Sequence, residues 1–261
     1  MALPQRKRDP PAQIHECRKK EMTVKPTFPE ILFEDDSIIV LNKPAGLLSI
    51  PDREQTSLSL KDMLLAKYGS IFTVHRLDKD TSGIILFART EAAHKYYSRL
   101  FEERKIEKYY LGLVLGSPAH PKGTMDEPIS EHPVQKGLMV VHRKGKPAVT
   151  DYEVVEAFKT YSLVQFQLHT GRTHQIRVHC KNMGHPLACD ELYGDAKPIL
   201  LSSIKRKYKL SKWEETEQPI LGRLALHAYR LRFTDEKGTL HDLSAEMPKD
   251  MRALLQQLRK V

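Results

Sequence analysis

Cysteine is scarce in this chain of 261 residues, which contains only Cys17, Cys180 and Cys189. An odd number of cysteines without a short paired spacing argues against a disulfide framework and against a cysteine-rich zinc site. We therefore expect the protein to work in a reducing compartment.

Long apolar runs are missing as well. No stretch approaches the roughly 18 to 20 apolar residues that a membrane-spanning helix needs. Residues 1–20 also lack the apolar segment of a signal peptide. The sequence therefore predicts a cytoplasmic protein that does not enter a membrane, and we expect it to be a monomer.

Signatures of nucleotide cofactors and metals are also lacking. The chain contains neither a G-x-x-x-x-G-K phosphate loop nor a dinucleotide fingerprint. His174 and His179 are five positions apart, so they do not share a helix face as an i, i+4 metal-binding pair would. We expect no cofactor and no metal, and we interpret the histidines as structural.

Acidic residues are the minority charge, with 33 Asp and Glu against 42 Lys and Arg, which gives a net charge of +9. Such a surface attracts polyanions at low salt. A basic surface that merely keeps the protein soluble is the alternative, and charge alone does not decide between them. The clustered basic residues are Arg6–Arg8, Arg18–Lys20 and Lys205–Lys209.

The first 30 residues form a basic arm rather than a domain. They contain five prolines and seven Lys or Arg without a sustained apolar period, so they cannot bury enough surface to fold alone. A free tail, a strand docked on the body and a nucleic-acid contact remain open for this arm. We expect one large domain over residues 31–261, with an inserted basic loop around residues 197–222 that is either solvated or turned toward nucleic acid.

Short apolar runs alternate with helical patterns along the domain. This order predicts an α+β fold with a mixed, mainly antiparallel sheet and flanking helices, because the regular rhythm of a nucleotide-binding sheet is absent. The expected strands are 37–48 with its turn, 71–74, 84–87, 109–115, 148–158, 162–168 and 224–233, the pair 148–158 and 162–168 forming a hairpin. The expected helices are 57–68, 91–104, 173–183 and 249–259.

The most informative segment is His75–Gly83, with the sequence HRLDKDTSG, which lies between the apolar runs Ile71–Val74 and Ile84–Phe87. This pattern predicts a strand, a polar loop and a second strand, and loops held on a rigid scaffold often carry functional residues. Asp78 has an arginine and a lysine within two positions. An aspartate that caps a turn is the structural alternative.

This segment resembles the catalytic-loop motif of the RluA-type RNA pseudouridine synthases. Five further segments resemble the family's other motifs in the family's order, namely Asn42–Gly46, Lys108–Gly116, Leu168–His179, Gly184–Leu187 and Leu226–Ala228. The resemblance implies the pseudouridine synthase catalytic fold and a reaction without a cofactor. The implied partner is structured RNA, a stem-loop of ribosomal or transfer RNA. The arm is too short and too polar to be the S4-type RNA-binding domain that many members carry.

Isomerising uridine to pseudouridine breaks the bond from N1 to C1′ and rejoins the base through C5, so the target base must leave the helical stack. By resemblance, Asp78 is the catalytic carboxylate. It can attack C1′, add to C6 of the base or take a proton from C2′, and the sequence leaves these three routes open.

A buried carboxylate needs a cation to stay ionised. By resemblance Arg177 is that catalytic partner, since a planar guanidinium can grip both carboxylate oxygens. Arg172 is the competitor and is otherwise expected to bind RNA phosphate. Adjacent strand residues point to opposite faces, so only one of Tyr109 and Tyr110 can enter the site. The family spacing selects Tyr110 as the third catalytic residue, which stacks on the uracil or moves a proton at C5.

Arg76 lies two positions before Asp78, and the resemblance implies that it fills the gap left by the flipped base. The residues expected to bind RNA are Arg76, Arg172, Lys43 and His75, the last of which should also hold the loop by hydrogen bonding. The alternative function is a catalytically silent RNA-binding protein or RNA chaperone on the same fold. A metal-dependent phosphoesterase that uses Asp78, Asp80 and histidines is a third class.

Overall fold

The computed structural model describes residues 27–52, 54, 57–205, 208–210 and 216–261. Most of the basic arm and part of the basic loop therefore lie outside the described residues, and their proposed contacts with RNA remain predictions. In the part of the chain that the structure describes, no helix is long and apolar enough to span a membrane.

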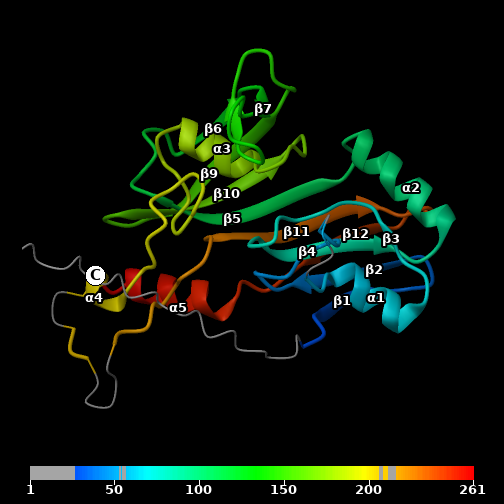
Figure 1. Cartoon of the computed structure of the whole chain (residues 1–261), viewed down its shortest axis with the longest axis horizontal. Coiled ribbons are helices and arrows are strands. Elements are labelled where there is room, and N and C mark those ends of the chain that lie inside the picture. The colour runs from blue at the N-terminus through cyan, green and yellow to red at the C-terminus, as the bar shows by residue number, and fades with distance from the viewer. Residues whose placement is uncertain (1–26, 53, 55–56, 206–207, 211–215) are drawn as a thin grey trace, which may run out of the picture.

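A large mixed sheet forms the body of the protein (Figure 1). Within the described ranges its strand order is β1-β2-β4-β11-β5-β10-β9-β6, with β12 added to β11 and β3 added to β4. Only the β4–β11 pair among these is parallel. The strands are β1 (Glu30–Glu34), β2 (Ile38–Lys43), β3 (Phe72–Thr73), β4 (Ser82–Ala88), β5 (Glu107–Leu115), β6 (Lys122–Asp126), β9 (Val149–Ala157), β10 (Tyr161–Leu168), β11 (Leu226–Thr234) and β12 (Leu240–Ser244).

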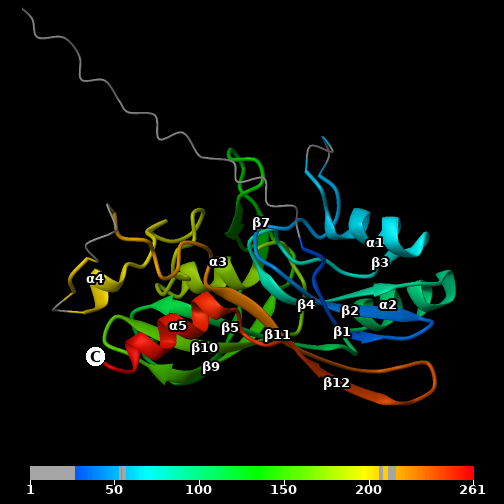
Figure 2. The same ribbon diagram turned by 90° about the horizontal axis from the view of Figure 1, so that it is seen from below.

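A separate two-stranded hairpin and five helices surround this sheet in the described part of the chain. The hairpin pairs β7 (Ile129–Glu131) with β8 (Met139–Val141). The helices are α1 (Leu60–Tyr68), α2 (Glu91–Glu102), α3 (Gln175–Asn182), α4 (Leu201–Ile204) and α5 (Lys249–Leu258). In Figures 1 and 2, α3 and the hairpin lie by β9 and β10, whereas α1 and α2 flank the β2–β4 end. The predicted α+β fold with a mainly antiparallel sheet is confirmed.

Local sequence explains where the first two helices begin. Ser59 caps α1: its Oγ accepts a hydrogen bond from the Asp62 amide at 3.2 Å, while the Asp62 carboxylate accepts from the Ser59 amide at 3.0 Å. This reciprocal pair satisfies two donors that a helix start would otherwise leave free. Thr90 caps α2 through its Oγ1, which accepts from the Ala93 amide.

The centre of the core is β4, whose seven residues are all buried. Its start is held against β11, where Ala228 pairs with Gly83 in parallel register. Gly83 has a φ of +115°, and a Cβ there would lie 2.0 Å from the Ala228 carbonyl oxygen. Glycine is therefore required at this position. Because β4 follows the His75–Gly83 loop directly, this contact also fixes where the loop ends.

The predicted hairpin of β9 and β10 is confirmed, with Phe166 opposite Tyr152. The inserted loop around residues 197–222 is anchored at its base, where Ile199 pairs with Leu221. Strands β1, β6 and β12 and the β7–β8 hairpin were not expected from the sequence. Cys180 and Cys189 are both buried free thiols.

Candidate active site

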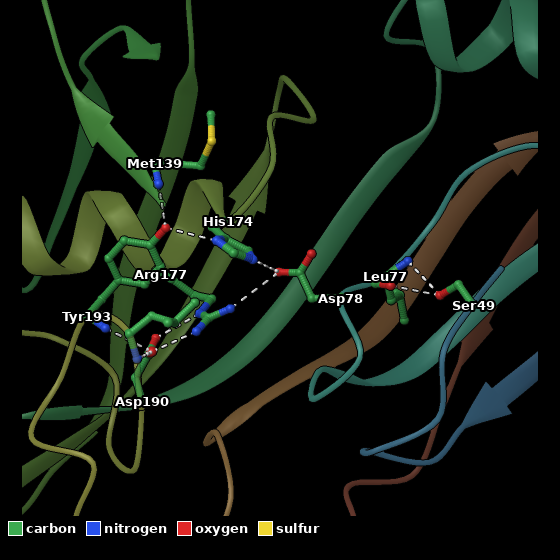
Figure 3. A network of polar contacts seen from close by, with 9 residues as sticks. Ser49, Leu77, Asp78, Met139, His174, Arg177, Asp190 and Tyr193 are labelled. Carbon is green, nitrogen blue, oxygen red and sulfur yellow. Dashed lines mark hydrogen bonds and ion pairs between the residues drawn. The ribbon is translucent and has the colours of Figure 1, made fainter. Parts of the chain in front are cut away.

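A pocket of about 420 Å³ lies between the loop before β4, the strand β5 and the start of α3. This volume falls within the roughly 300 to 1,000 Å³ that is typical of ligand sites. Its lining brings together six of the seven residues predicted for the site, which are His75, Arg76, Asp78, Tyr110, Arg172 and Arg177. Figure 3 shows the polar contacts around Asp78.

The loop that carries Asp78 is held by hydrogen bonds on both sides of the carboxylate. Before it, the Ser49 Oγ donates to the Leu77 carbonyl at 2.7 Å and accepts from the Leu77 amide at 3.1 Å (Figure 3). After it, the Lys43 ammonium donates to the Lys79 carbonyl at 2.9 Å. Asp78 is thus fixed between two anchored backbone positions.

Lys43 differs from the expectation that it contacts RNA. Its side chain is fully buried, and its ammonium also donates to the carbonyl oxygens of Pro44 and Leu47. Burial lowers its pKa to about 7, although the nearby carboxylates of Asp80 and Asp78 act in the opposite direction. All three donors of the ammonium bind backbone carbonyls inside the protein. Lys43 therefore holds the loop and has no donor left for RNA.

His75 anchors the start of the same loop, as the sequence predicted. Its Nε2 accepts a hydrogen bond from the Leu86 amide at 3.0 Å, and its ring stacks on Phe101 with centroids 4.5 Å apart. Burial, assisted by the charge of Lys108, lowers its pKa to about 3. The ring is therefore neutral at physiological pH.

Asp78 faces one arginine and one histidine. Its Oδ2 lies 3.9 Å from the Arg177 guanidinium and 3.9 Å from the His174 Nε2, and 23% of its side chain is exposed. The predicted pairing with Arg177 is thus present, whereas Arg172 lies at the pocket wall and donates from its Nε to the Pro147 carbonyl at 3.0 Å. These distances favour Arg177 over Arg172 as the partner of Asp78.

Arg177 makes its bidentate hydrogen bonds to Asp190 rather than to Asp78. Its Nε and one terminal nitrogen donate to Asp190 at 2.8 and 2.7 Å, which leaves the other terminal nitrogen toward Asp78 (Figure 3). The amides of Leu192 and Tyr193 also donate to Asp190. Burial alone would raise the pKa of Asp190, but the Arg177 guanidinium outweighs burial and holds the pKa below its ordinary value.

Sequence reasoning missed Asp190 because nothing in its neighbourhood resembles a catalytic loop. It lies 13 residues after Arg177, beyond the end of α3, and the two meet only in the folded protein. A signal existed in retrospect, since a buried arginine needs an acidic partner and few carboxylates lie near α3 in the sequence.

The side chain of His174 is held in place beside Asp78 by Tyr193. The Tyr193 hydroxyl accepts a hydrogen bond from the Met139 amide at 2.9 Å and lies 2.8 Å from the His174 Nδ1 (Figure 3). The contact between the Tyr193 hydroxyl and Nδ1 orients the imidazole ring so that its Nε2 faces Asp78. Burial lowers the pKa of His174, which favours the neutral form of the ring.

The two adjacent tyrosines lie on opposite faces of β5, as their spacing predicted. Tyr110 is buried and lines the pocket, and burial together with the Asp78 charge raises its pKa. The Tyr109 hydroxyl instead donates to Glu107 at 2.7 Å, and its ring contacts Arg230. Only Tyr110 can therefore touch a ligand in this pocket. Arg76 is exposed at the same wall.

Within the described ranges, no group of three or more His, Cys, Asp or Glu residues lies close enough together to hold a metal ion.

The fold and the pocket define a class of protein: an enzyme with one loop carboxylate at the centre of a mixed sheet, facing an arginine and a buried tyrosine. The sequence profile of the family described as RNA pseudouridylate synthase matches residues 37–182. The chain belongs to this family, and the resemblance of its motifs is confirmed.

Individual relatives agree with this assignment. The protein named ribosomal large subunit pseudouridine synthase D of Nitrosomonas europaea is 38% identical over 89% of this chain and 66% of its own length. The protein of the same name from Pasteurella multocida is 36% identical over 88% of this chain and 70% of its own length. The solved structure of human RNA pseudouridylate synthase domain containing 4 covers 88% of this chain and 93% of its own, with 27% identity and a TM-score of 0.68. This chain thus spans about two thirds of the length of the first two relatives.

Proposed function

We propose that this protein isomerises specific uridines to pseudouridine in large-subunit ribosomal RNA, with Asp78 as the catalytic carboxylate. The observation that carries this proposal is the position of Asp78, partly exposed in a nucleoside-sized pocket and 3.9 Å from the Arg177 guanidinium. The names of the two relatives favour the large-subunit ribosomal RNA as substrate.

Each pocket residue has a chemical task in this reaction. The bond from N1 to C1′ breaks, a bond from C5 to C1′ forms, and a proton leaves C5 while N1 gains one. The Asp78 carboxylate acts while ionised, by attack at C1′, by addition to C6 or by removal of a proton from C2′. The positive charge of Arg177 favours that ionised form.

Tyr110 forms the wall against which the extracted uracil rests. Its buried ring offers a stacking face, and its hydroxyl keeps its proton because its pKa is raised. Arg76 is exposed at the pocket wall, where its flat cation can occupy the place of the flipped base and contact phosphate. Arg172 lies beside it as a second phosphate contact.

The substrate is tested by mapping pseudouridines in total RNA from cells with the gene, without the gene and with the gene restored. The proposal expects one or more large-subunit sites to lose pseudouridine without the gene and to regain it on restoration. The purified protein should then modify an unmodified transcript of that rRNA region. Loss of pseudouridine only in transfer RNA would contradict the ribosomal substrate, and no loss anywhere would contradict the activity.

A further inference from the structure

A second group of donors lines the pocket beside the start of β5. Lys108 and Tyr110 are two positions apart on this strand, so their side chains point to the same face, about 7 Å apart along it. Arg104, in the turn between α2 and β5, and His75 line the same wall. A uracil resting on Tyr110 would therefore place the sugar–phosphate chain of its strand within reach of these donors.

Among the residues that the structure describes, Lys108 and His75 each have a donor without an acceptor. Lys108 is half-buried, yet its ammonium makes no hydrogen bond or ion pair with any residue that the structure describes, and only the Phe101 ring faces it, at 5.9 Å. The Nε2 of neutral His75 accepts from Leu86, so its proton lies on Nδ1, for which no acceptor exists in the described ranges. Neither the Lys108 Nζ nor the His75 Nδ1 is among the buried unpaired atoms of the described residues, so both face the open pocket, where a ligand can accept from them.

The charges around Lys108 favour an anion. Burial and, to a smaller extent, the charge of Arg104 together lower the pKa of Lys108 to about 8. The other charged or titratable groups that line this pocket are Arg76, Asp78, Glu102, His169, Arg172, His174 and Arg177. Glu102 is the one carboxylate among them at the α2 end, and it forms no ion pair with Lys108 or Arg104 among the described residues.

We propose that Lys108, Arg104 and the Nδ1–H of His75 form a subsite for one phosphodiester of the RNA strand, next to the uridine that enters the pocket. This subsite rests on the proposed function, since it serves the same RNA. It binds phosphate through two cations and one neutral donor, and it positions the strand so that the base reaches Tyr110 and Asp78. None of its members touches the reacting atoms.

Binding of a stem-loop substrate tests the subsite directly. Lys108→Gln should weaken RNA binding about tenfold or more, because it removes a charged hydrogen bond, and should flatten the slope of log K against log salt by about 0.7 to 0.9. The loss should appear in KM more than in kcat. Lys105→Gln is the matched control, because Lys105 lies in the turn just before β5 but is exposed and paired with Glu103.

The titration of Lys108 gives a second readout. The wild-type affinity should fall as the pH rises from about 7 to 9, because the ammonium loses its charge near its pKa of about 8. Lys108→Arg should retain the affinity at pH 7 and lose this decline, since the guanidinium stays charged. Lys108→Gln should lose the decline together with the affinity.

A methylphosphonate at each position around the target uridine locates the phosphate. At one position the neutral linkage should weaken wild-type binding and leave Lys108→Gln unaffected. Equal losses in both proteins at every position, or an unchanged affinity in Lys108→Gln, would overturn the subsite. Because these binding measurements need no turnover, they separate failure of the subsite from failure of the enzymatic activity, which the wild-type product assay reports.

Discussion

Arg177 contacts two carboxylates of unequal burial. Asp190 is fully buried and takes two of its nitrogens, while the partly exposed Asp78 faces the third. A guanidinium fixed in this way cannot turn away when the pocket is empty. At the scale of single residues, the pairing with Asp190 thus holds the positive charge of Arg177 at a fixed place beside Asp78.

Replacing Asp190 should cost both stability and activity. Asp190→Asn removes the buried carboxylate that takes two nitrogens of Arg177, so we expect a loss of about 3 kcal/mol in the free energy of unfolding. Urea denaturation measures this loss. The double variant Arg177→Met with Asp190→Asn removes both charges, keeps an acceptor for the amides of Leu192 and Tyr193 and should recover much of the stability, yet it should form no pseudouridine. Full activity in the double variant would show that Arg177 does not support catalysis.

The same pair predicts how stability depends on pH. The folded pKa of Asp190 is below its unfolded value of roughly 3.9, so its contribution is complete above about pH 4 and is lost as the pH falls through the folded pKa. Acid unfolding of the wild type should contain this component, and the double variant should lack it.

Motifs predicted Asp78, Arg177 and Tyr110 because each lies in a contiguous segment that resembles the family pattern. Asp190 and Tyr193 could not be predicted in this way, since their roles arise from contacts with Arg177 and His174 that the chain makes only after folding. Lys43 shows a different limit. The sequence predicted that it binds RNA, whereas its buried ammonium donates to backbone carbonyls and holds the loop.

At the scale of elements, the parallel pairing of β4 with β11 determines where the catalytic loop ends. The two strands approach closely at Gly83 and Ala228, and His227 lies 3.0 Å from the Ser82 hydroxyl beside them. Local sequence predicted both strands but not this pairing, because strands 138 residues apart leave no periodic signal of their contact.

Gly83→Ala should therefore destabilise the whole fold. The added Cβ meets the Ala228 backbone and the φ is unfavourable for alanine, so we expect a loss of about 3 kcal/mol or more in the free energy of unfolding. Gly238→Ala is the control, since Gly238 also has a positive φ but open space around it, and should cost about 1 to 2 kcal/mol. Similar urea midpoints for the two variants would contradict the importance of this contact.

Four of the strands that the sequence did not predict, β6, β7, β8 and β12, lack the pattern that marks a strand. The β7 and β8 strands are three residues each, too short to show an alternating pattern. The β6 and β12 strands are largely exposed and polar, so they lack the apolar face that marks a strand. Long elements with a buried face, such as β4, β10 and α5, were predicted with boundaries close to those observed.

At the scale of the whole molecule, the net charge of +9 and the cations around the pocket suit a polyanionic substrate. Residues 1–26 of the basic arm and residues 206–207 and 211–215 of the basic loop lie outside the described residues, so contacts of these segments with RNA stay a prediction. Within the described residues, the proposed catalytic carboxylate, Asp78, lies in this pocket.

The most direct test of this catalytic role is pseudouridine formation by Asp78→Asn, measured under single-turnover conditions with saturating RNA. Asp80→Asn, an exposed carboxylate two positions away, is the control and should retain activity. We predict that Asp78→Asn lowers the rate at least about 1,000-fold, as loss of a central catalytic group does elsewhere, with RNA affinity nearly unchanged. A rate within about tenfold of the wild type would contradict the assignment of Asp78 as the catalytic residue.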